Sequence, residues 1–472
     1  MKISRAVLAL LIVVAIVTSS RQARGQDAAD LLAQTPQRLQ ASNPVHNNQF
    51  IGFGAAVGID GDVLLVGAPG EDSSTTMGVV DTGAVYVFER QGFDWVEVQK
   101  LRAPTELANE KFGAAVGVAL GDAGVDALIV GAPGYSATSG RAYLYERTDG
   151  GSWEHEATLT QDVPNGGDLF GGSVGIDFFV PPNSLSGDPV FIAVASSPFD
   201  RDPLDAGNSQ HGSIRVFQRT GDPPTWGPSH DFYGEPNERL GASVAIAGPD
   251  IVAGATGLDG PGTGDGGGRV FRQANELPVG FNYVESWELQ TAAAVNNLGL
   301  GQTAALDDDT ASFGTAVLGA PGYDQPVLNA GKIYVFDLTP GGMGTIRNEV
   351  AEIQPASLPA GAAFGTSIAL SGPILAVGAP GLTGEGKIYL YERGATKAVW
   401  NPAGELTPPP LTPPFSCTVA AAVALQGLTA GIGCPTTTSR YQDEGVYLYF
   451  GSGIFVDDFE GGNTGRWTVS VP

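Results

Sequence analysis

The chain contains few of the residues from which reactive centres are commonly built. Among its 472 residues there are 2 cysteines and 4 histidines. No Gly-x-Ser-x-Gly nucleophile elbow and no phosphate-binding loop occurs in the sequence. The histidines show no metal-ligand spacing, and they are His46, His155, His211 and His230. We therefore predict no catalytic residue and no enzyme activity.

Positive charge and long apolar runs are also scarce. The 24 Lys and Arg residues face 50 Asp and Glu residues, for a net charge of −26. Nucleic acids and anionic membranes are polyanions, so this balance argues against both as partners. One apolar run, residues 6–17, follows Lys2 and Arg5 and is too short to span a bilayer. Small residues around Gly25 then complete the pattern of a secretory signal peptide at 1–25, so we expect export.

What the sequence does contain is one three-part phrase that returns seven times, about every 60 residues. A Phe-Gly or Leu-Gly step opens a run of small apolar residues, a second run ends in Gly-Ala-Pro, and a third reads Gly-x-x-Tyr-x-Phe. The glycines of the opening step are Gly54, Gly113, Gly171, Gly241, Gly301 and Gly365, with Ala420 in the seventh copy. The second anchor is Pro69, Pro133, Pro198, Thr256, Pro321, Pro380 and Pro435. Copies three and four are the degenerate ones, at 196–198 and 254–256.

Each phrase is followed by a fourth apolar segment, usually marked by tryptophan. These segments are 95–101, 153–159, 226–232, 287–289 and 400–406, while the fifth copy offers only 346–353. All are short, rich in β-branched and aromatic residues, and bounded by Gly, Pro, Asn or Asp, which is typical of strands. Four strands in each of seven units predict an all-β, seven-bladed β-propeller over residues 26–451.

No fourth segment follows the last copy, but a matching one precedes the first. Gln37-Arg38-Leu39 echoes Gln99-Lys100-Leu101. We predict that the N-terminal strand completes the last blade and closes the ring, which removes two exposed sheet edges. The periodic tryptophans are better explained by packing between blades than by a sugar-binding site.

The pairing of Phe-Gly with Gly-Ala-Pro resembles the FG-GAP repeat of the integrin α-subunit propeller, and more closely its bacterial secreted variant. The resemblance covers about residues 37–450. It implies a seven-bladed propeller that works outside the cell in adhesion or ligand binding. The partner would be an extracellular protein or a glycan, bound by a monomer.

Integrin-type repeats often carry a calcium loop between the first and second strands. The residues at the corresponding turns of this chain do not match such a loop. The corresponding turns are 60–62, 121–126, 247–250 and 371–373. None supplies oxygens at the alternate positions that a calcium cage needs, so we predict no bound cofactor. Acidic residues gather instead in the loops after Gly-Ala-Pro, where we interpret them as solvated loop tips. They are Glu71, Asp72, Asp81, Asp200, Asp202, Asp205, Asp259 and Asp265, of which Asp72, Asp202 and Asp265 are the candidates for loosely bound calcium.

The two cysteines lie in the seventh copy, at the start of its first strand and the end of its second. Antiparallel pairing would bring Cys417 and Cys434 together, so we predict a disulfide, which suits an exported protein. Residues 452–472 lie outside the repeats and resemble a short ending, Asp-Phe-Glu-Gly followed by Trp, of bacterial secreted proteins. That ending suggests a role in sorting or attachment.

These observations favour a secreted, non-catalytic propeller for adhesion or ligand binding. Two alternatives stay open from sequence. One is a carbohydrate-binding lectin that uses the tryptophans, and the other is an extracellular hydrolase or lyase with its site on the loops.

Overall fold

A computed structural model describes most of the chain between residues 27 and 450. The described residues are 27–46, 50–121, 124–179, 190–201, 209–220, 225–273, 283–295, 298–307, 314–339, 345–382, 386–409, 418, 420–435 and 444–450. The predicted signal peptide at 1–25 and the predicted tail at 452–472 lie outside these ranges.

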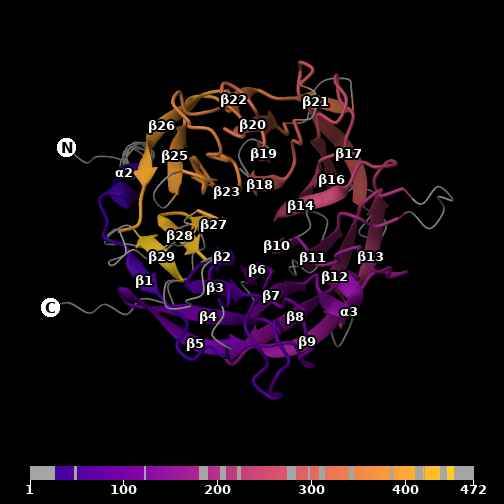
Figure 1. Ribbon diagram of the computed structural model, residues 1–472, viewed down its shortest axis with the longest axis vertical. Helices are drawn as coiled ribbons and strands as arrows, with labels where there is room; N and C mark the ends of the chain where they lie inside the picture. Colours follow the sequence, from indigo (N-terminus) through magenta and orange to yellow (C-terminus); the bar gives the residue numbers. More distant parts are fainter. Residues whose placement is uncertain are drawn as a thin grey trace, which may run out of the picture.

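The described strands form seven sheets set in a ring around a central axis (Figure 1). Within a blade, strands that are consecutive in the chain lie side by side and antiparallel, from the innermost to the third or fourth. Many of the second strands are buried along their whole length, because neighbouring blades cover both faces of the sheet. The predicted all-β, seven-bladed propeller is therefore confirmed.

The strands of the first three blades are listed from the axis outward. They are β2 (Ala56–Asp60), β3 (Val63–Ala68), β4 (Ala84–Gln91) and β5 (Asp94–Leu101); β6 (Ala115–Leu120), β7 (Val125–Ala132), β8 (Arg141–Thr148) and β9 (Glu154–Leu159); β10 (Val174–Phe179), β11 (Val190–Ser197), β12 (Ser213–Thr220) and β13 (Thr225–Tyr233).

The other four blades follow in the same order. They are β14 (Leu240–Ala247), β15 (Asp250–Ala255), β16 (Gly267–Gln273) and β17 (Tyr283–Gln290); β18 (Thr303–Asp307), β19 (Thr315–Ala320), β20 (Lys332–Asp337) and β22 (Ala351–Ile353); β23 (Ser367–Ser371), β24 (Ile374–Ala379), β25 (Lys387–Arg393) and β26 (Trp400–Leu406); β27 (Ala422–Gln426), β28 (Thr429–Cys434), β29 (Gly445–Phe450) and β1 (Gln37–Leu39).

The antiparallel order gives the ring two different faces. The loops between second and third strands, and the connections from each fourth strand to the next blade, emerge on one face, which we call the loop face. The short turns between first and second strands, and between third and fourth, emerge on the opposite face, which we call the turn face. Those acidic loop residues identified in the sequence that the structure describes belong to the loop face.

The N-terminal strand closes the ring, as predicted. β1 pairs antiparallel with β29, with Gln37 opposite Leu448 and Leu39 opposite Val446. The Gln37 side chain also reaches the first blade, where its amide bonds the backbone of Trp95 in both directions, at 3.1 and 3.0 Å. Gln99 makes the same two bonds to Trp153 in the second blade. The two glutamine-containing segments are therefore similar in sequence because each glutamine makes the same contact with the outer strand of the next blade.

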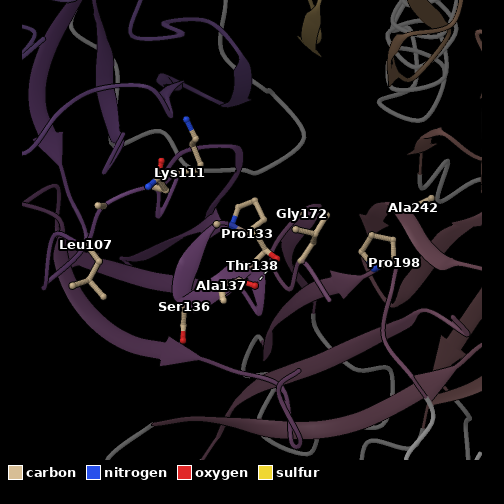
Figure 2. Close-up of a pocket in the computed structure, with 13 residues that line it drawn as sticks. Leu107, Lys111, Pro133, Ser136, Ala137, Thr138, Gly172, Pro198 and Ala242 are labelled. Atoms are coloured by element: carbon tan, nitrogen blue, oxygen red, sulfur yellow. Dashed lines mark hydrogen bonds between the residues drawn. The ribbon is translucent and has the colours of Figure 1, made fainter. Parts of the chain in front are cut away.

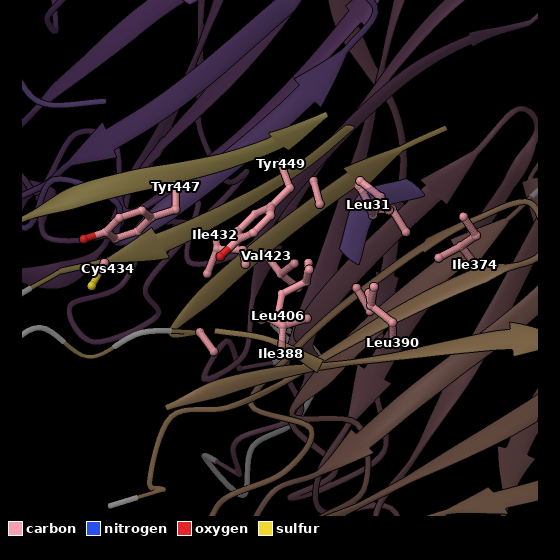
Figure 3. Packing of buried hydrophobic residues seen from close by; sticks show 14 residues of the cluster. Leu31, Ile374, Ile388, Leu390, Leu406, Val423, Ile432, Cys434, Tyr447 and Tyr449 are labelled. Carbon is pink, nitrogen blue, oxygen red and sulfur yellow. The ribbon is translucent and has the colours of Figure 1, made fainter. Parts of the chain in front are cut away.

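A short helix, which the sequence pattern did not indicate, precedes the closing strand. Helix α2 (Asp27–Leu32) packs against the sixth and seventh blades, and Leu31 is fully buried there among Leu390, Leu406 and Tyr449 (Figure 3). Six residues are too few to display helical periodicity, so only the receiving surface reveals the helix.

The fifth blade divides its last segment between two sheets. The sequence predicted one strand over 346–353. Instead, Ala351–Ile353 alone forms β22 of the fifth blade, while β21 (Ile346–Asn348) adds in parallel to β17 as a fifth strand of the fourth blade. The first part of this segment pairs with the open edge of β17 and so does not join the fifth blade.

The repeated glycines are explained by contacts between blades. Gly83 opens the third strand of the first blade and forms a parallel bridge with Phe112 of the second. Its φ is +88°, and a methyl group on it would lie 2.0 Å from the Phe112 carbonyl oxygen. Gly67 of the Gly-Ala-Pro anchor lies equally close to Gly113, since a methyl group there would stand 2.0 Å from the Gly113 oxygen. The motif thus marks where two backbones touch.

Substitution of Gly83 by alanine should destabilise the propeller well beyond the cost of its backbone conformation. Gly92 provides a matched control, because its φ is +68° but a methyl group there meets nothing within 4 Å. A left-handed conformation costs alanine about 1–2 kcal/mol at either site. We expect Gly83→Ala to lose roughly 2 kcal/mol more than Gly92→Ala in urea unfolding, through overpacking. Equal losses would contradict the contact described here.

Candidate functional site

The acidic residues of the loop face are mostly buried, which corrects their interpretation as solvated loop tips. Glu71 and Asp265 are 0% exposed, Asp200 is 5% exposed and Asp72 is 7% exposed. Asp259 is exposed as expected, and Asp202 and Asp205 lie outside the described residues. The loops fold back over the blade ends, where the carboxylates accept bonds from backbone and side-chain donors.

Glu71 is the centre of the densest of these networks. Its carboxylate accepts hydrogen bonds from the Tyr86 hydroxyl at 2.6 Å, from Lys100 Nζ at 2.9 Å and from the guanidinium of Arg102. The backbone N–H of Val45 adds a bond at 3.2 Å. The network joins the N-terminal segment to the first blade, and it accounts for two of the few basic residues of the loop face.

A second set of acids lies two residues before the Phe or Leu of the opening step, a signal that the sequence reasoning missed. Glu238 forms a two-bond ion pair with Arg269, at 2.6 and 2.8 Å. Glu110 accepts a hydrogen bond from the Tyr143 hydroxyl, and burial raises the pKa of Glu110. Asp168 takes the same place in the third copy.

Asp168, like Glu110, forms no ion pair among the described residues, and it lies close to a second acid, Asp200. Its carboxylate accepts the backbone N–H of Asn165 at 2.6 Å. Burial first, and then the nearby negative charge of Asp200, raise the pKa of Asp168 to about 6, while the charge of Arg201 acts in the opposite direction. Asp168 therefore titrates near pH 6, above the usual range of an aspartate.

This titration predicts a stability that increases as the pH falls. The folded protein holds the Asp168 proton more tightly than the unfolded chain, whose carboxyl has the ordinary pKa of 3.8. Below about pH 4 the Asp168 carboxyl is protonated in both states and does not lower the free energy of unfolding. As the pH rises through about 6, this carboxyl lowers the free energy of unfolding by on the order of 2–3 kcal/mol. Asp168→Asn should be more stable than the parent at pH 8 and equal to it at pH 4. Urea unfolding at both values checks this, and a constant difference between the two proteins would contradict it.

Two further acids precede the third strand of their blades. Glu444 links two blades by hydrogen bonds, and Asp265 has one carboxylate oxygen without a described partner. Glu444, just before β29, accepts the backbone N–H groups of Gly52 and Phe53, each at 3.0 Å, and so attaches the seventh blade to the first. Asp265 has the equivalent place in the fourth blade, where Oδ2 accepts the N–H of Gly262 at 2.6 Å and buried Oδ1 lacks a described hydrogen-bond partner.

The two candidate calcium ligands that the structure describes, Asp72 and Asp265, do not converge. Asp72 Oδ1 accepts the N–H of Asp81 at 3.1 Å, and Asp265 lies in the fourth blade, away from Asp72 in the first. Within the described ranges, no three His, Cys, Asp or Glu side chains meet in an arrangement that could hold a metal ion.

On the turn face, polar side chains of the turns between first and second strands accept hydrogen bonds from neighbouring blades. Asp60 Oδ2 accepts the N–H of Leu120 in the second blade at 2.6 Å, and Asp177 accepts that of Gly248 in the fourth blade at 2.7 Å. Ser371 accepts the N–H of Gly427 at 3.0 Å. Burial raises the pKa of Asp60. These turns are built for bonding to the next blade.

A pocket of about 930 Å³ opens on the loop face where the second, third and fourth blades meet (Figure 2). Its apolar wall comes from three blades and includes Leu107, Pro133, Leu169, Pro198 and Ala242. Lys111 is the single charged residue among the 13 that line it, and none of the 13 is acidic or aromatic. Loops from separate repeats therefore build one concave, largely apolar site.

The backbone around the pocket is set by the repeat, and the side chains vary. The residue before the Phe or Leu of the opening step has a positive φ in six copies, namely Gly52, Lys111, Leu169, Arg239, Gly299 and Ala363. Lys111 and Leu169 line the pocket from this position. The left-handed turn of α3 (Tyr135–Thr138), with φ of +46° at Ser136 and +56° at Ala137, forms another part of the wall.

Three apolar side chains on the loops of this face beside the pocket and in the first blade are exposed. Phe50 is 45% exposed, Met77 is 99% exposed and Leu107, which lines the pocket, is 39% exposed. The loops that carry them are joined, because the N–H of Ser74 bonds Glu106 at 2.8 Å and Gly70 lies against Phe50. We call Phe50, Met77 and Leu107 the apolar strip.

The aromatic and histidine residues occupy other roles. Trp95 and Trp153 are 3% and 2% exposed and pack in the blade cores, as predicted. His211 bonds the Gly234 carbonyl through Nδ1 at 2.8 Å, and His230 stacks on Phe232. These side chains do not face the pocket.

Residues 37–88 match the family model of the FG-GAP repeat. The matched segment begins in β1, the outer strand of the last blade, and ends in β4, the third strand of the first. The match and the seven-bladed ring together fit an FG-GAP repeat propeller. One repeat of such a propeller therefore spans two blades, which explains why its motif residues lie where blades touch. A search of curated proteins found no match. No helix within the described ranges is long and apolar enough to cross a membrane.

The disulfide remains a prediction, because Cys417 lies outside the described residues. Cys434 is fully buried at the end of β28. The N–H of Thr418 bonds the Pro435 carbonyl at 2.8 Å, so the residues that follow the two cysteines are neighbours.

Proposed function

We propose that this FG-GAP repeat propeller is exported and binds an extracellular partner, as an adhesion or recognition protein without catalytic activity. The observation that carries the proposal is the pocket on the loop face together with the adjoining apolar strip. Exposed apolar patches of this kind mark interaction sites, and concave apolar pockets with a few polar groups are typical of binding sites. The pattern of a signal peptide at 1–25 supports export.

A protein partner fits this surface better than a glycan. Sugar rings are commonly bound on aromatic platforms, and none of the 13 lining residues is aromatic. The tryptophans proposed for a lectin are held in blade packing. Hydrolase or lyase chemistry receives no support from the pocket, whose lining contains no carboxylate or histidine.

The test compares the two faces of the ring. Beads coated with the mature protein are incubated with intact cells of the producing organism, and attached beads are counted. We expect Phe50→Ser with Met77→Ser and Leu107→Ser to lower attachment about tenfold, because a few buried apolar residues dominate such interfaces. The control replaces Phe93 and Val399, which are 78% and 47% exposed on the turn face, by serine. Attachment that is absent, or unaffected by the triple change, would contradict the proposal.

We further propose that binding and stability need no tightly held metal ion. A tight ligand at a thousandfold excess over its Kd would stabilise the fold by about 4 kcal/mol. We therefore expect a calcium chelator to leave the melting temperature unchanged in a thermal scan. A drop of several degrees would reveal a site completed by backbone carbonyls, and Asp265 would be the first residue to examine.

A further inference from the structure

One basic residue lines the pocket and two more lie within three positions of its lining residues, although the protein as a whole is strongly acidic. The chain has 50 acidic and 24 basic residues. Lys111 lines the pocket, Arg201 follows the lining residue Pro198 by three positions, and Arg239 precedes the lining residue Ala242 by three. The pocket wall thus carries one basic side chain and no acidic one.

Two of these three basic side chains are exposed to solvent. Arg201 and Arg239 are exposed and form no ion pair with any described residue. The Arg239 guanidinium lies 5.8 Å from the ring centre of Phe199, which follows Pro198 in the chain and places this charge beside the pocket. Lys111 shares its charge with Asp81, at 2.7 Å, and keeps 39% of its side chain exposed.

Two of the described acids close to these basic residues in the chain are buried and hydrogen-bonded. Asp168 and Asp200 are buried beneath the loops, at 1% and 5% exposure, and are engaged by Asn165, Ser213 and the backbone of Arg201. Screening limits electrostatic interactions between exposed charges to about 8 Å at physiological salt, so the distant negative charges of the ring contribute little at the pocket.

Resting on the function proposed above, we infer that the pocket receives a protein segment in which a carboxylate adjoins apolar side chains. Arg201 and Arg239 would pair with the carboxylate, and the wall of Leu107, Leu169 and Pro198 would receive the apolar neighbours. A segment of a protein suits the site better than a free organic acid, because the apolar strip extends the contact surface beyond the pocket opening.

The experiment uses saturation-transfer NMR on the mature protein with three probes. The first is the peptide acetyl-Gly-Leu-Asp-Leu-Gly-amide, the second replaces its Asp by Asn, and the third is phenylacetate, a free acid on an apolar body. We expect the Asp peptide to bind about fivefold or more tightly than the Asn peptide, in keeping with a pair of exposed charge contacts. Raising the salt concentration should weaken the binding of the Asp peptide.

Three variants locate the contact. Ala137→Trp, at an exposed position of the wall, should abolish binding by filling the pocket. Arg201→Ala with Arg239→Ala should bring the affinity for the Asp peptide down to that for the Asn peptide. Lys387→Ala removes one exposed positive charge in the sixth blade and should leave binding unchanged. Both arginines and Ala137 are exposed, and an unchanged melting temperature shows that each variant is folded.

Equal binding of the two peptides, or binding that survives Ala137→Trp, would overturn the inference. Binding of phenylacetate without either peptide would assign the pocket to a small acid and would also overturn it. Cell attachment that still depends on the apolar strip would leave the proposed function intact in either case, so the two failures are distinguishable.

Discussion

Removal of residues 26–41 is expected to destabilise the propeller by at least about 5 kcal/mol, or to prevent its folding. The segment supplies β1, the outer strand of the seventh blade, and helix α2. Leu31 and Leu39 are 0% and 4% exposed, and loss of each such side chain costs about 2–5 kcal/mol. The deletion also exposes the edge of β29, whose backbone groups then lose their partners.

Single substitutions keep this prediction testable if the truncated protein aggregates. Leu31→Asp places a carboxylate between the sixth and seventh blades, whereas Ala33→Asp adds the same charge at an exposed position two residues later. We expect a large loss of stability in urea unfolding for the first and little change for the second. Similar stability of the two variants would show that α2 does not support the closed ring.

Replacement of Glu71 by alanine is expected to cost about 3–5 kcal/mol, because it removes the shared partner of two cations near the loop face. The side chains of Lys100 and Arg102 are only 20% and 12% exposed, so water compensates them poorly. The Tyr86 hydroxyl loses its acceptor in the same change. Urea unfolding measures the effect, and Glu154→Ala provides an exposed acidic control.

Two companion variants separate the loss of contacts from the burial of charge. Tyr86→Phe removes one hydrogen bond and should cost about 1 kcal/mol. Glu71→Leu combined with Lys100→Met and Arg102→Met removes every charge of the network, and it should recover much of the loss, since apolar replacement of a buried ionic cluster is often tolerated. A Glu71→Ala protein as stable as the parent would mean that the network is solvated.

The predictions that succeeded concern features repeated in every blade. Seven copies of one phrase predicted seven blades, and the unmatched segment at Gln37 predicted the ring closure. Both depend on backbone contacts that recur with the repeat, such as Gly83 against Phe112, and a recurring contact leaves a recurring residue.

The predictions that failed concern contacts between segments that are distant in the chain. The acidic loops were expected in solvent, but Glu71 is buried because Lys100 and Arg102 of the same blade meet it. The segment 346–353 was expected in one strand, but the edge of β17 takes Ile346–Asn348. A sequence pattern predicts the conformation of one segment. It does not show which strand edge or which charged side chain that segment contacts in the folded protein.

The amino-acid sequence by itself determined the number of blades, their strand order and the closure of the ring, because Gly, Pro and short apolar segments specify local backbone geometry and recur in each repeat. Only the tertiary structure decided the candidate site. The pocket combines Lys111, Pro198 and Ala242 from three blades, and the buried acids depend on donors brought to them by neighbouring strands. Such sites arise where loops of different repeats converge, and convergence is a property of the closed ring.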